Sequence, residues 1–449
     1  MIIRNKQELA TTELRTQALE IIEVGIERVL PEVLMRSSVS YDHSNRILTV
    51  NGHNYDVSKG RIFVIGGGKA SGLMAKTIED IVGVNNIMAG VVTCKSGSNN
   101  FETRKIKMVP AGHPIPDQRG VNGIHEMLHL KTAYSINEND LLLCLISGGG
   151  SALMPCPADG INLKDKQYVT ELLLSSGADI YEINTVRKHL SQTKGGRLGN
   201  CYSPASVVSL ILSDVIGNDL SIIASGPTYP DSSTFSDACS VLEKYKLLFR
   251  LPGRIADFLR KGSRGLLEET PETLENSHNH IIGDNTLALE AMAQKARNMG
   301  FAPHIVTAEQ KGETSTVARF RANEILSGKY AKCNALLIGG ETTPTLPAYA
   351  GKGGRNQHYA AISMLAMARY PGEWLVASVG TDGSDFLPGV AGAIVDQNSF
   401  DIAQAKEIDV KSYVERYDSN TLLNSIGSSL IITGDTGTNV GDVNIYLTS

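Results

Sequence analysis

The segment RIFVIGGGKASGLMAKTIEDIV, residues 61–82, decides the fold of this chain. A short apolar run ends in three glycines, and a stretch with helical character follows. Because the run shows no alternation of apolar and polar residues, it is typical of a strand buried on both faces, as in parallel sheets. The succession of strand, glycine turn and helix predicts an α/β fold.

The same pattern recurs along the chain. It returns in DLLLCLISGGGSAL (140–153), VVSLILSDVIGND (207–219), ALLIGGETT (335–343) and WLVASVGTDGSD (374–385). We therefore expect mainly parallel sheets with flanking helices. Ligands of such sheets collect at the carboxyl ends of the strands, and this chain places its glycines, hydroxyl groups, carboxylates and cations there.

The length of the chain predicts more than one domain. With 449 residues, of which 42% are hydrophobic, it has material for two or three domains with sizeable cores. Residues 260–280 are polar and charged, and they indicate a surface connection. We expect an N-terminal α/β domain over residues 1–270 and a C-terminal α/β domain over 271–449. The boundary moves to about 330 if the next strand belongs to the first domain.

Composition argues against several classes of protein. The chain has 42 Lys and Arg against 47 Asp and Glu, a net charge of −5, which is a poor match for a nucleic-acid binder. Its six cysteines form no CxxC pair, so we expect a reducing, cytoplasmic location without disulfides or zinc fingers. The longest aliphatic run, Leu141 to Ile146, is far shorter than the roughly 20 residues that span a membrane. The first 30 residues lack the apolar core of a signal peptide.

Common nucleotide-binding and catalytic motifs are absent from the sequence. There is no GxxxxGK[ST] phosphate loop, and in GGGKASG the position that a dinucleotide GxGxxG motif needs as glycine is Ser71. A nicotinamide cofactor therefore has no support. No Ser-His-Asp or Cys-His set can be assembled from spacing, and His113, between a glycine and a proline, is interpreted as structural.

Two glycine-rich turns are the first candidate binding sites. GGGKA (66–70) and SGGGSA (147–152) each follow an apolar run and open a helix, where backbone N–H groups and the helix dipole can hold an anion. Either turn alone is explained equally well as an ordinary connection, but two in one sheet favour an anion-binding crevice. The candidate residues are Gly67, Gly68, Lys69, Ser147, Gly148, Gly149, Gly150 and Ser151.

Cations and carboxylates follow at later strand ends. INTVRKHLSQTKGGRLG (183–199) is rich in cations, which the dipole also favours near the end of a helix. SDVIGND (213–219) and GTDGSD (380–385) carry carboxylates that suit Mg²⁺ or a sugar-acid hydroxyl, although turn chemistry explains them as well. GGETT (339–343) and GKGGRNQ (351–357) place a glutamate and an arginine near one strand end. The candidates are Asn184, Arg187, Lys194, Asp214, Asn218, Asp219, Glu341, Arg355, Asn356, Asp382 and Asp385.

In their order, these motifs resemble those of the class II glycerate kinases, also called the MOFRL family. The resemblance runs from about residue 10 to the C-terminus, through GGGKA, AGHPIPD, SGGGSAL, NTVRKHLSQTKGGRL, SDVIGND, SGPT, GGETT, GKGGRNQ, TDGSD and TGDTGTNVGDV. It implies a larger N-terminal α/β domain, a C-terminal domain, and an active site in the cleft between them. It also implies ATP-dependent phosphorylation of D-glycerate, giving 2-phosphoglycerate and ADP, with Mg²⁺.

The resemblance assigns roles to particular residues. The family's catalytic lysine corresponds to Lys69, and its active-site arginine corresponds to Arg355. Both would neutralise charge that develops on the transferring phosphoryl group. The glycine turns would cradle the anionic ends of the substrates. The candidate Mg²⁺ ligands are Asp214, Asp219, Asp382 and Asp385. One of the first three would hold Mg²⁺ or accept the proton of the attacking hydroxyl group.

Two positions depart from the family pattern. His358 follows GGRNQ where the family has glutamate, and Phe386 replaces the last glycine of TDGTDG. We expect the first to alter a contact on a helix face and the second to alter the metal or nucleotide loop. Two alternatives stay open: a hydroxypyruvate reductase, and a sugar-acid-binding protein without turnover. The residues do not decide between a monomer and a homodimer.

Overall fold

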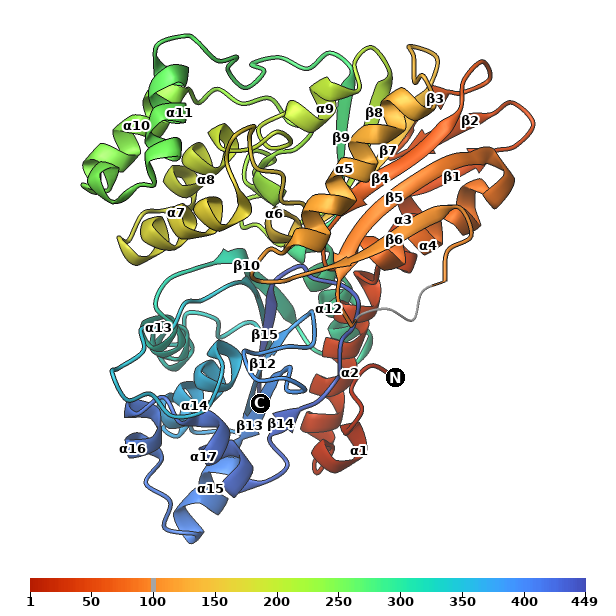
Figure 1. Ribbon diagram of the computed structural model, residues 1–449. Helices are drawn as coiled ribbons and strands as arrows, with labels where there is room; N and C mark the ends of the chain where they lie inside the picture. The colour runs from red at the N-terminus through yellow and green to blue at the C-terminus, as the bar shows by residue number, and fades with distance from the viewer. Residues whose placement is uncertain (98–101) are drawn as a thin grey trace. The chain divides into compact units, whose positions relative to one another are not determined.

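The computed structural model describes residues 1–97 and 102–449, and these divide into two compact units (Figure 1). The N-terminal unit comprises Leu34–Ile282. The C-terminal unit comprises Gly283–Ser449 together with Met1–Val33. The division between residues 282 and 283 lies between the two boundaries considered from the sequence, and the first 33 residues group with the end of the chain.

A six-stranded sheet forms the centre of the N-terminal unit. Its order is β6-β5-β4-β7-β8-β9, and the neighbouring pairs from β6 to β8 are parallel. Every residue of β4 and β7 is buried, which explains why their sequences do not alternate. The expected parallel α/β sheet is confirmed in this unit. Its strands are β4 (Ile62–Gly67), β5 (Ile87–Lys95), β6 (Ile106–Ala111), β7 (Leu141–Ser147), β8 (Ser206–Leu212) and β9 (Ser277–Gly283).

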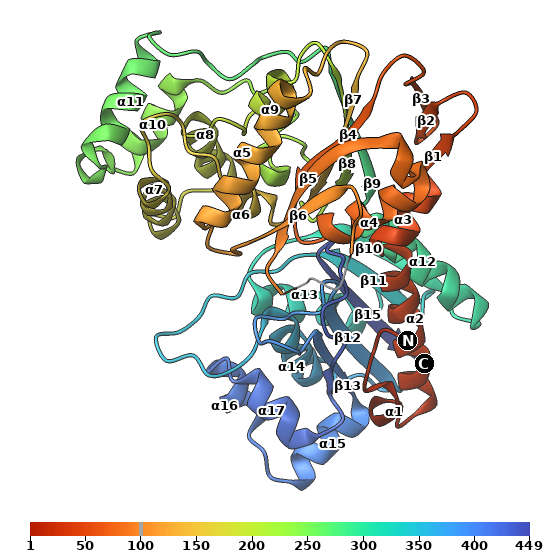
Figure 2. The same cartoon turned by 45° about the vertical axis from the view of Figure 1, so that its right-hand side comes forward.

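Helices cover both faces of this sheet. α5 (Gln118–Ala133) shares a buried cluster with one face, in which Ile124 and Met127 join Phe63 and Leu142. α4 (Ser71–Val82), which follows β4, lies on the opposite face (Figures 1 and 2). This is the arrangement that right-handed crossovers produce when the chain moves to one edge of a sheet and then returns.

Smaller elements complete the N-terminal unit. β1 (Val39–Asp42), β2 (Ile47–Val50) and β3 (His53–Asp56) form an antiparallel sheet. Four helices, α7, α8, α10 and α11, enclose a second core of their own. The helices of this part are α3 (Pro31–Ser38), η1 (Val84–Asn86), α6 (Gly150–Leu153), α7 (Leu163–Ser175), α8 (Ile180–His189), α9 (Arg197–Cys201), η2 (Ile223–Ser225), α10 (Phe235–Lys244), η3 (Leu248–Arg250) and α11 (Gly253–Ser263).

The sheet of the C-terminal unit corrects the expectation of mainly parallel sheets. Its order is β10-β11-β15-β12-β13-β14, and only β10 and β11 are parallel. The last strand, β15, runs antiparallel between β11 and β12. Because a strand buried on both faces has the same apolar run in either direction, periodicity could not reveal this. The strands are β10 (Pro303–Gln310), β11 (Ala335–Gly340), β12 (Trp374–Gly380), β13 (Gly392–Asp396), β14 (Leu430–Ile431) and β15 (Asp442–Thr448).

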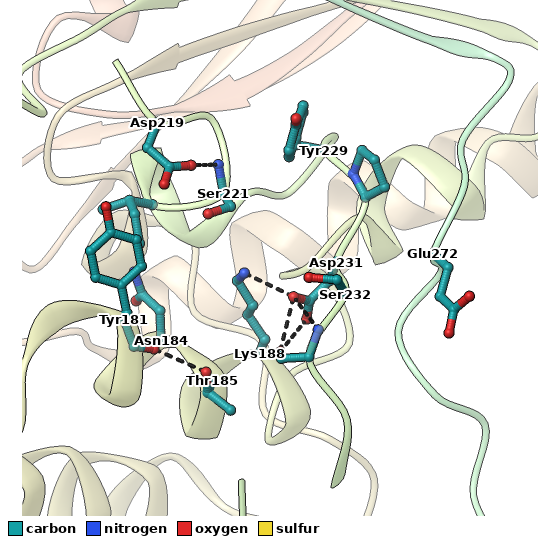
Figure 3. A pocket seen from close by; sticks show the side chains of 13 residues that line it. Tyr181, Asn184, Thr185, Lys188, Asp219, Ser221, Tyr229, Asp231, Ser232 and Glu272 are labelled. Atoms are coloured by element: carbon teal, nitrogen blue, oxygen red, sulfur yellow. Dashed lines mark hydrogen bonds and ion pairs between the residues drawn. The ribbon is translucent and has the colours of Figure 1, made fainter. Parts of the chain in front are cut away.

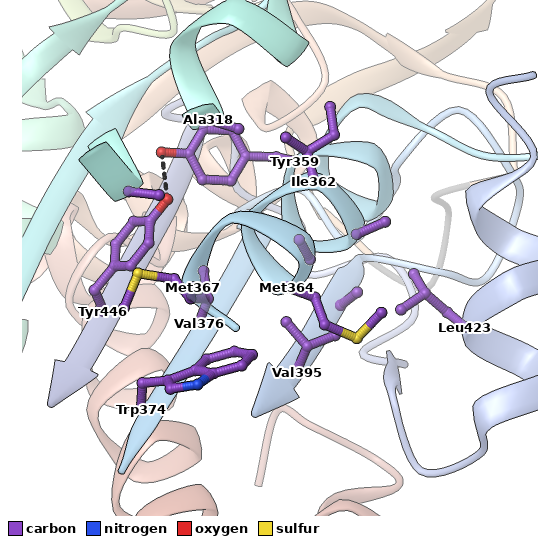
Figure 4. Packing of buried hydrophobic residues seen from close by; sticks show 14 of the residues in the cluster. Ala318, Tyr359, Ile362, Met364, Met367, Trp374, Val376, Val395, Leu423 and Tyr446 are labelled. Atoms are coloured by element: carbon purple, nitrogen blue, oxygen red, sulfur yellow. Dashed lines mark hydrogen bonds between the residues drawn. The ribbon is translucent and has the colours of Figure 1, made fainter. Parts of the chain in front are cut away.

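The core of the C-terminal unit is built around α14 (Arg355–Met367). Tyr359 and Met364 of this helix belong to one buried cluster with Trp374 and Tyr446 of the sheet (Figure 4). The Tyr446 hydroxyl donates a hydrogen bond to the Tyr359 hydroxyl at 3.1 Å (Figure 4). The helix is therefore rigidly held, and its first residue, Arg355, is a predicted site residue.

The N-terminal helix packs within the same unit. α2 (Glu13–Arg28) and α12 (Asn285–Asn298) approach so closely that a Cβ atom at Gly25 would lie 2.5 Å from Cγ of Met292. In the described part of the chain, no helix is long and apolar enough to cross a membrane. The other helices of the unit are α1 (Lys6–Leu9), α13 (Thr314–Leu326), α15 (Gln397–Ala405), α16 (Val410–Glu415) and α17 (Ser419–Ile426).

Candidate functional site

The turns after β4 and β7 lie next to each other at the carboxyl end of the N-terminal sheet. From these neighbouring strands the chain continues toward opposite edges, to β5 and to β8. Such a reversal opens a crevice in which α/β proteins bind ligands. The Lys69 N–H donates to the carbonyl of Gly148 at 2.9 Å, and the Ala70 N–H donates to Oγ of Ser147 at 3.0 Å. The structure thus joins the two glycine turns that the sequence singled out.

Glycine is required where the two turns touch. Gly68 has a φ of 157°, and a Cβ atom there would lie 2.1 Å from Oγ of Ser147. Gly149 has a φ of 80°, and its Cβ atom would lie 2.8 Å from the ring of His113 and 3.2 Å from Cγ of Lys69. Close packing accounts for both glycines without a ligand. The same geometry places His113, interpreted as structural from the sequence, beside Lys69 at the candidate site.

A pocket of about 520 Å³ opens beside these turns, between the turn after β7, residues 113–116, α7 and α8. Four of the predicted site residues line it. They are Gly149, Ser151, Arg187 and Lys194.

Lys166 lines the same pocket and was missed from the sequence. It lies on the buried stripe of α7 with Val169 and Leu173, at helical spacing. A lysine at a position where an apolar residue is expected is the signal that could have identified it.

Three basic side chains, those of Lys166, Arg187 and Lys194, line this pocket together with the carboxylate of Glu171. Lys166 and Lys194 are buried, and burial together with the Arg187 charge lowers the pKa of Lys166 to about 7. Burial, together with the positive charges of Lys166 and Arg187, lowers the pKa of Lys194 well below its usual value. Among the described residues, none of the three cations forms an ion pair with a carboxylate. Buried positive charge of this kind is costly unless an anion compensates it.

A hydrogen-bonded chain leads from this pocket to a second one. Ser151 Oγ lies 2.8 Å from Ser225 Oγ, which donates to Oδ1 of Asn184 at 2.9 Å. Asn184 lines a second pocket of about 440 Å³ (Figure 3). There Lys188 Nζ donates to Asp231 Oδ1 at 3.0 Å, so this cation is neutralised (Figure 3).

The polar residues after β8 lie at the same end of the sheet. Asp214 and Asn218 belong to the segment that follows this strand, and Asn218 takes a left-handed φ of 57°. Asp219 lines the second pocket and accepts a hydrogen bond from the Ser221 N–H at 2.9 Å (Figure 3). Asp219 therefore lines the second pocket, and Asp214 precedes it in the same segment after β8.

Arg355 in the C-terminal unit is held by two carboxylates. Its Nε and Nη2 donate to the two oxygens of Asp442 at 2.6 and 2.9 Å, and its Nη1 pairs with Glu341 at 2.7 Å. Burial acts to lower the pKa of the Arg355 guanidinium, but the nearby carboxylates, Asp442 foremost and Glu341 next, together outweigh it and raise that pKa above its usual value. These contacts use three of the five N–H groups of a guanidinium. Asp442, which the sequence analysis did not single out, belongs to the quoted motif TGDTGTNVGDV.

Asp385 holds the start of α14. Its two carboxylate oxygens accept the N–H groups of Asn356 and Gln357, each at 2.9 Å. Burial raises the pKa of Asp385 to about 6 in spite of these bonds. Asn356 is also buried, and its Oδ1 accepts a hydrogen bond from Ser378 at 2.6 Å. Both residues therefore position the helix that carries Arg355.

The candidate metal ligands fall into separate groups. Asp214 and Asp219 belong to the N-terminal unit, whereas Asp382 and Asp385 belong to the C-terminal unit. Asp382 accepts a hydrogen bond from the N–H of Ser384 at 2.9 Å. Within residues 1–97 and 102–449, no three His, Cys, Asp or Glu side chains gather as a ready metal site.

The two departures from the family pattern have distinct structural consequences. His358 is buried, with its ring nitrogens 2.9 Å from Ser419 Oγ and 3.0 Å from Ser315 Oγ, and burial lowers the pKa of His358 to about 4. Its ring stacks on Tyr417 with the centroids 3.9 Å apart. Phe386 takes a φ of 63° and is 85% exposed. An aromatic residue in this left-handed conformation is strained.

Comparison with known proteins covers nearly the whole chain. Residues 17–260 match a domain of unknown function, DUF4147, and residues 334–442 match the MOFRL family. The chain is 38% identical to the glycerate 2-kinase of Pyrococcus horikoshii, over 96% of this chain and 98% of that protein. It is also 38% identical to the D-glycerate 2-kinase of Thermotoga maritima, over 97% and 98%. A crystal structure of the Thermotoga maritima glycerate kinase superposes with a TM-score of 0.84 at 36% identity, over 97% of this chain and 99% of that one.

Proposed function

We infer that this chain, which belongs to the MOFRL family of glycerate kinases, is itself a glycerate kinase that transfers a phosphoryl group from ATP to D-glycerate. The observation that carries this conclusion is the match to D-glycerate 2-kinases over almost the full length of both chains. The paired glycine turns at the reversal point of the N-terminal sheet support it, because backbone N–H groups and nearby cations there suit phosphate and carboxylate groups.

Lys69 and Arg355 are the proposed catalytic residues. Phosphoryl transfer depends on positioning and on neutralising negative charge more than on covalent chemistry. Lys69 extends from the turn that follows β4, beside Gly149 and His113. Arg355 keeps its planar orientation through Asp442, so its remaining N–H groups have a defined direction for phosphoryl oxygens.

Mg²⁺ is proposed to accompany the nucleotide. Proteins usually hold this ion through one or two carboxylates together with the substrate phosphates, so a ready cluster of three acidic side chains is not required. Asp214 and Asp219 fit this role best, as hard oxygen donors after a strand at the carboxyl end of the sheet. Asp385 fits it least, because both of its oxygens already accept backbone N–H groups. When bound, the ion would neutralise phosphate charge.

We also propose that the product is 2-phosphoglycerate and that the protein is cytoplasmic. The names of the two relatives support the 2-position, and six cysteines without a disulfide agree with a reducing compartment. The state of association, monomer or homodimer, stays a prediction.

Two assays test the proposal. Purified protein with D-glycerate, ATP and Mg²⁺ should release ADP, measured by a coupled assay, and should not oxidise NADH or NADPH with hydroxypyruvate. Phosphorus NMR of the product should show 2-phosphoglycerate. Reductase turnover without ADP release would replace the proposal by its enzymatic rival, and ligand binding without either turnover would favour a binding protein.

A further inference from the structure

We call the pocket beside the glycine turns the cation pocket, because the basic side chains of Lys166, Arg187 and Lys194 line one part of it. Lys166 is 7% exposed, and within residues 1–97 and 102–449 its Nζ has no hydrogen-bond partner. Arg187 Nε donates a hydrogen bond to Thr170 Oγ1 at 3.4 Å, and Lys194 Nζ donates one to the backbone carbonyl of Ala224 at 3.3 Å. A protein gains nothing in stability from burying these charges side by side, so their placement indicates an anionic ligand.

One wall of the cation pocket is apolar, and polar side chains, among them Gln167, Thr170 and Glu171, line other parts of it. Ile115, Pro116, Leu163 and Leu174 contribute to the apolar wall. Ile115 is 71% exposed and Leu174 is 60% exposed, so both present apolar surface near an opening to solvent. With a volume of about 520 Å³, the pocket has the size of typical small-molecule sites.

We propose that the cation pocket binds the nucleoside triphosphate, with its phosphates at Lys166, Arg187 and Lys194 and its base against the apolar wall. This inference rests on the proposed kinase function and specifies which substrate the pocket takes. Glycerate matches the pocket poorly, since a three-carbon acid would fill a small part of it and leave the apolar wall unused. A nucleotide has both a polyanionic end and a flat ring that stacks on apolar side chains.

Substitution of Lys166 by methionine tests the charged part. Lys166→Met keeps the length of the side chain and removes the charge, so the fold should be retained. Binding of a non-hydrolysable ATP analogue, measured by calorimetry without glycerate, should weaken at least about tenfold, the size of a lost hydrogen bond to a charged group. The melting temperature of the free protein should rise. Lys164→Met, on the exposed side of the same helix, is the matched control and should change neither value.

Substitution of Leu174 by serine tests the apolar wall. Because Leu174 is 60% exposed, Leu174→Ser should fold normally. It should weaken binding of the ATP analogue and leave binding of inorganic triphosphate unchanged, since only the nucleotide has a base.

The two variants also distinguish the rival occupant. Glycerate binding should stay at the level of the unchanged protein in Lys166→Met. Two results for Lys166→Met would overturn the assignment, even if the unchanged protein turns over glycerate and ATP. The first is a loss of affinity for glycerate with affinity for the nucleotide kept, and the second is no change in either affinity. A protein that binds nucleotide through Lys166 but releases no ADP with glycerate would instead refute the kinase function and leave the pocket assignment standing.

Discussion

Replacement of Arg355 separates its part in the fold from its part in the reaction. The Arg355 side chain is 30% exposed and Asp442 is 4% exposed, so Arg355→Ala would leave a nearly buried carboxylate without its partner. Breaking a buried pair costs about 3–5 kcal/mol. Because the arginine is partly exposed to water, we expect a loss of about 2–3 kcal/mol in the free energy of unfolding.

Lysine at this position keeps the charge and loses the paired N–H groups. For Arg355→Lys we expect a loss of stability of only about 1 kcal/mol, the net value of a hydrogen bond. If the guanidinium acts on the phosphoryl group in the transition state, kcat should still fall by about 10²- to 10³-fold with KM little changed. A rise in KM for glycerate alone would indicate instead that Arg355 grips the substrate carboxylate. The measurements are urea unfolding and the coupled ADP assay.

Arg15 provides a matched control within the same unit. It pairs with Asp396 in the same two-pronged geometry, with Nε to Oδ2 at 2.6 Å and Nη2 to Oδ1 at 3.1 Å. Arg15→Lys should lower stability at least as much, because its side chain is 3% exposed, and should leave kcat and KM unchanged at a temperature where the protein is folded. Full activity of Arg355→Lys, or an equal loss of kcat in Arg15→Lys, would refute a catalytic role for Arg355.

Three other substitutions test separate features. Lys69→Ala should lose about 10²-fold or more in kcat, by the size of preorganised electrostatic effects, with almost no change in melting temperature; near-normal kcat in the folded variant would make Lys69 a solvated turn residue. Burial lowers the pKa of His358 to about 4, against 6.5 for an ordinary histidine. The contribution of the neutral ring to the free energy of unfolding is therefore complete above pH 6.5 and is lost as the pH falls toward 4. This amounts to about 3 kcal/mol, and urea unfolding of His358→Gln should lack that part of the pH dependence; the same pH slope in both proteins would contradict it. Phe386→Gly should raise the free energy of unfolding by up to about 1 kcal/mol, because glycine adopts a φ of 63° without strain, and a destabilised variant would show that the ring makes a contact that matters more.

The local pattern of the sequence was sufficient for the strands and turns that carry the site. The run IFVI before GGGKA and the run LLLCLIS before GGG became β4 and β7, because a strand with both faces buried needs apolar residues at every position. The positions of Gly68 and Gly149 followed from the same turns. The residues that pack against these glycines did not follow from the local pattern, because the contacts of Gly68 with Ser147 and of Gly149 with His113 join segments far apart in the chain.

What only the tertiary structure decided depends on such distant contacts. The direction of β15 is set by its pairing with β11 and β12, and the grouping of residues 1–33 with the C-terminal unit is set by packing between the two ends of the chain. Periodicity encodes neither of these. For the same reason Lys166 was overlooked, because its importance lies in the neighbours that α7 and α8 bring to it and not in any motif. The sequence by itself determined the succession of strands and helices of an α/β fold, the positions of the glycine turns and the family resemblance. The folded chain decided which charges are buried together, since electrostatic environment is a property of distances between side chains and not of their order.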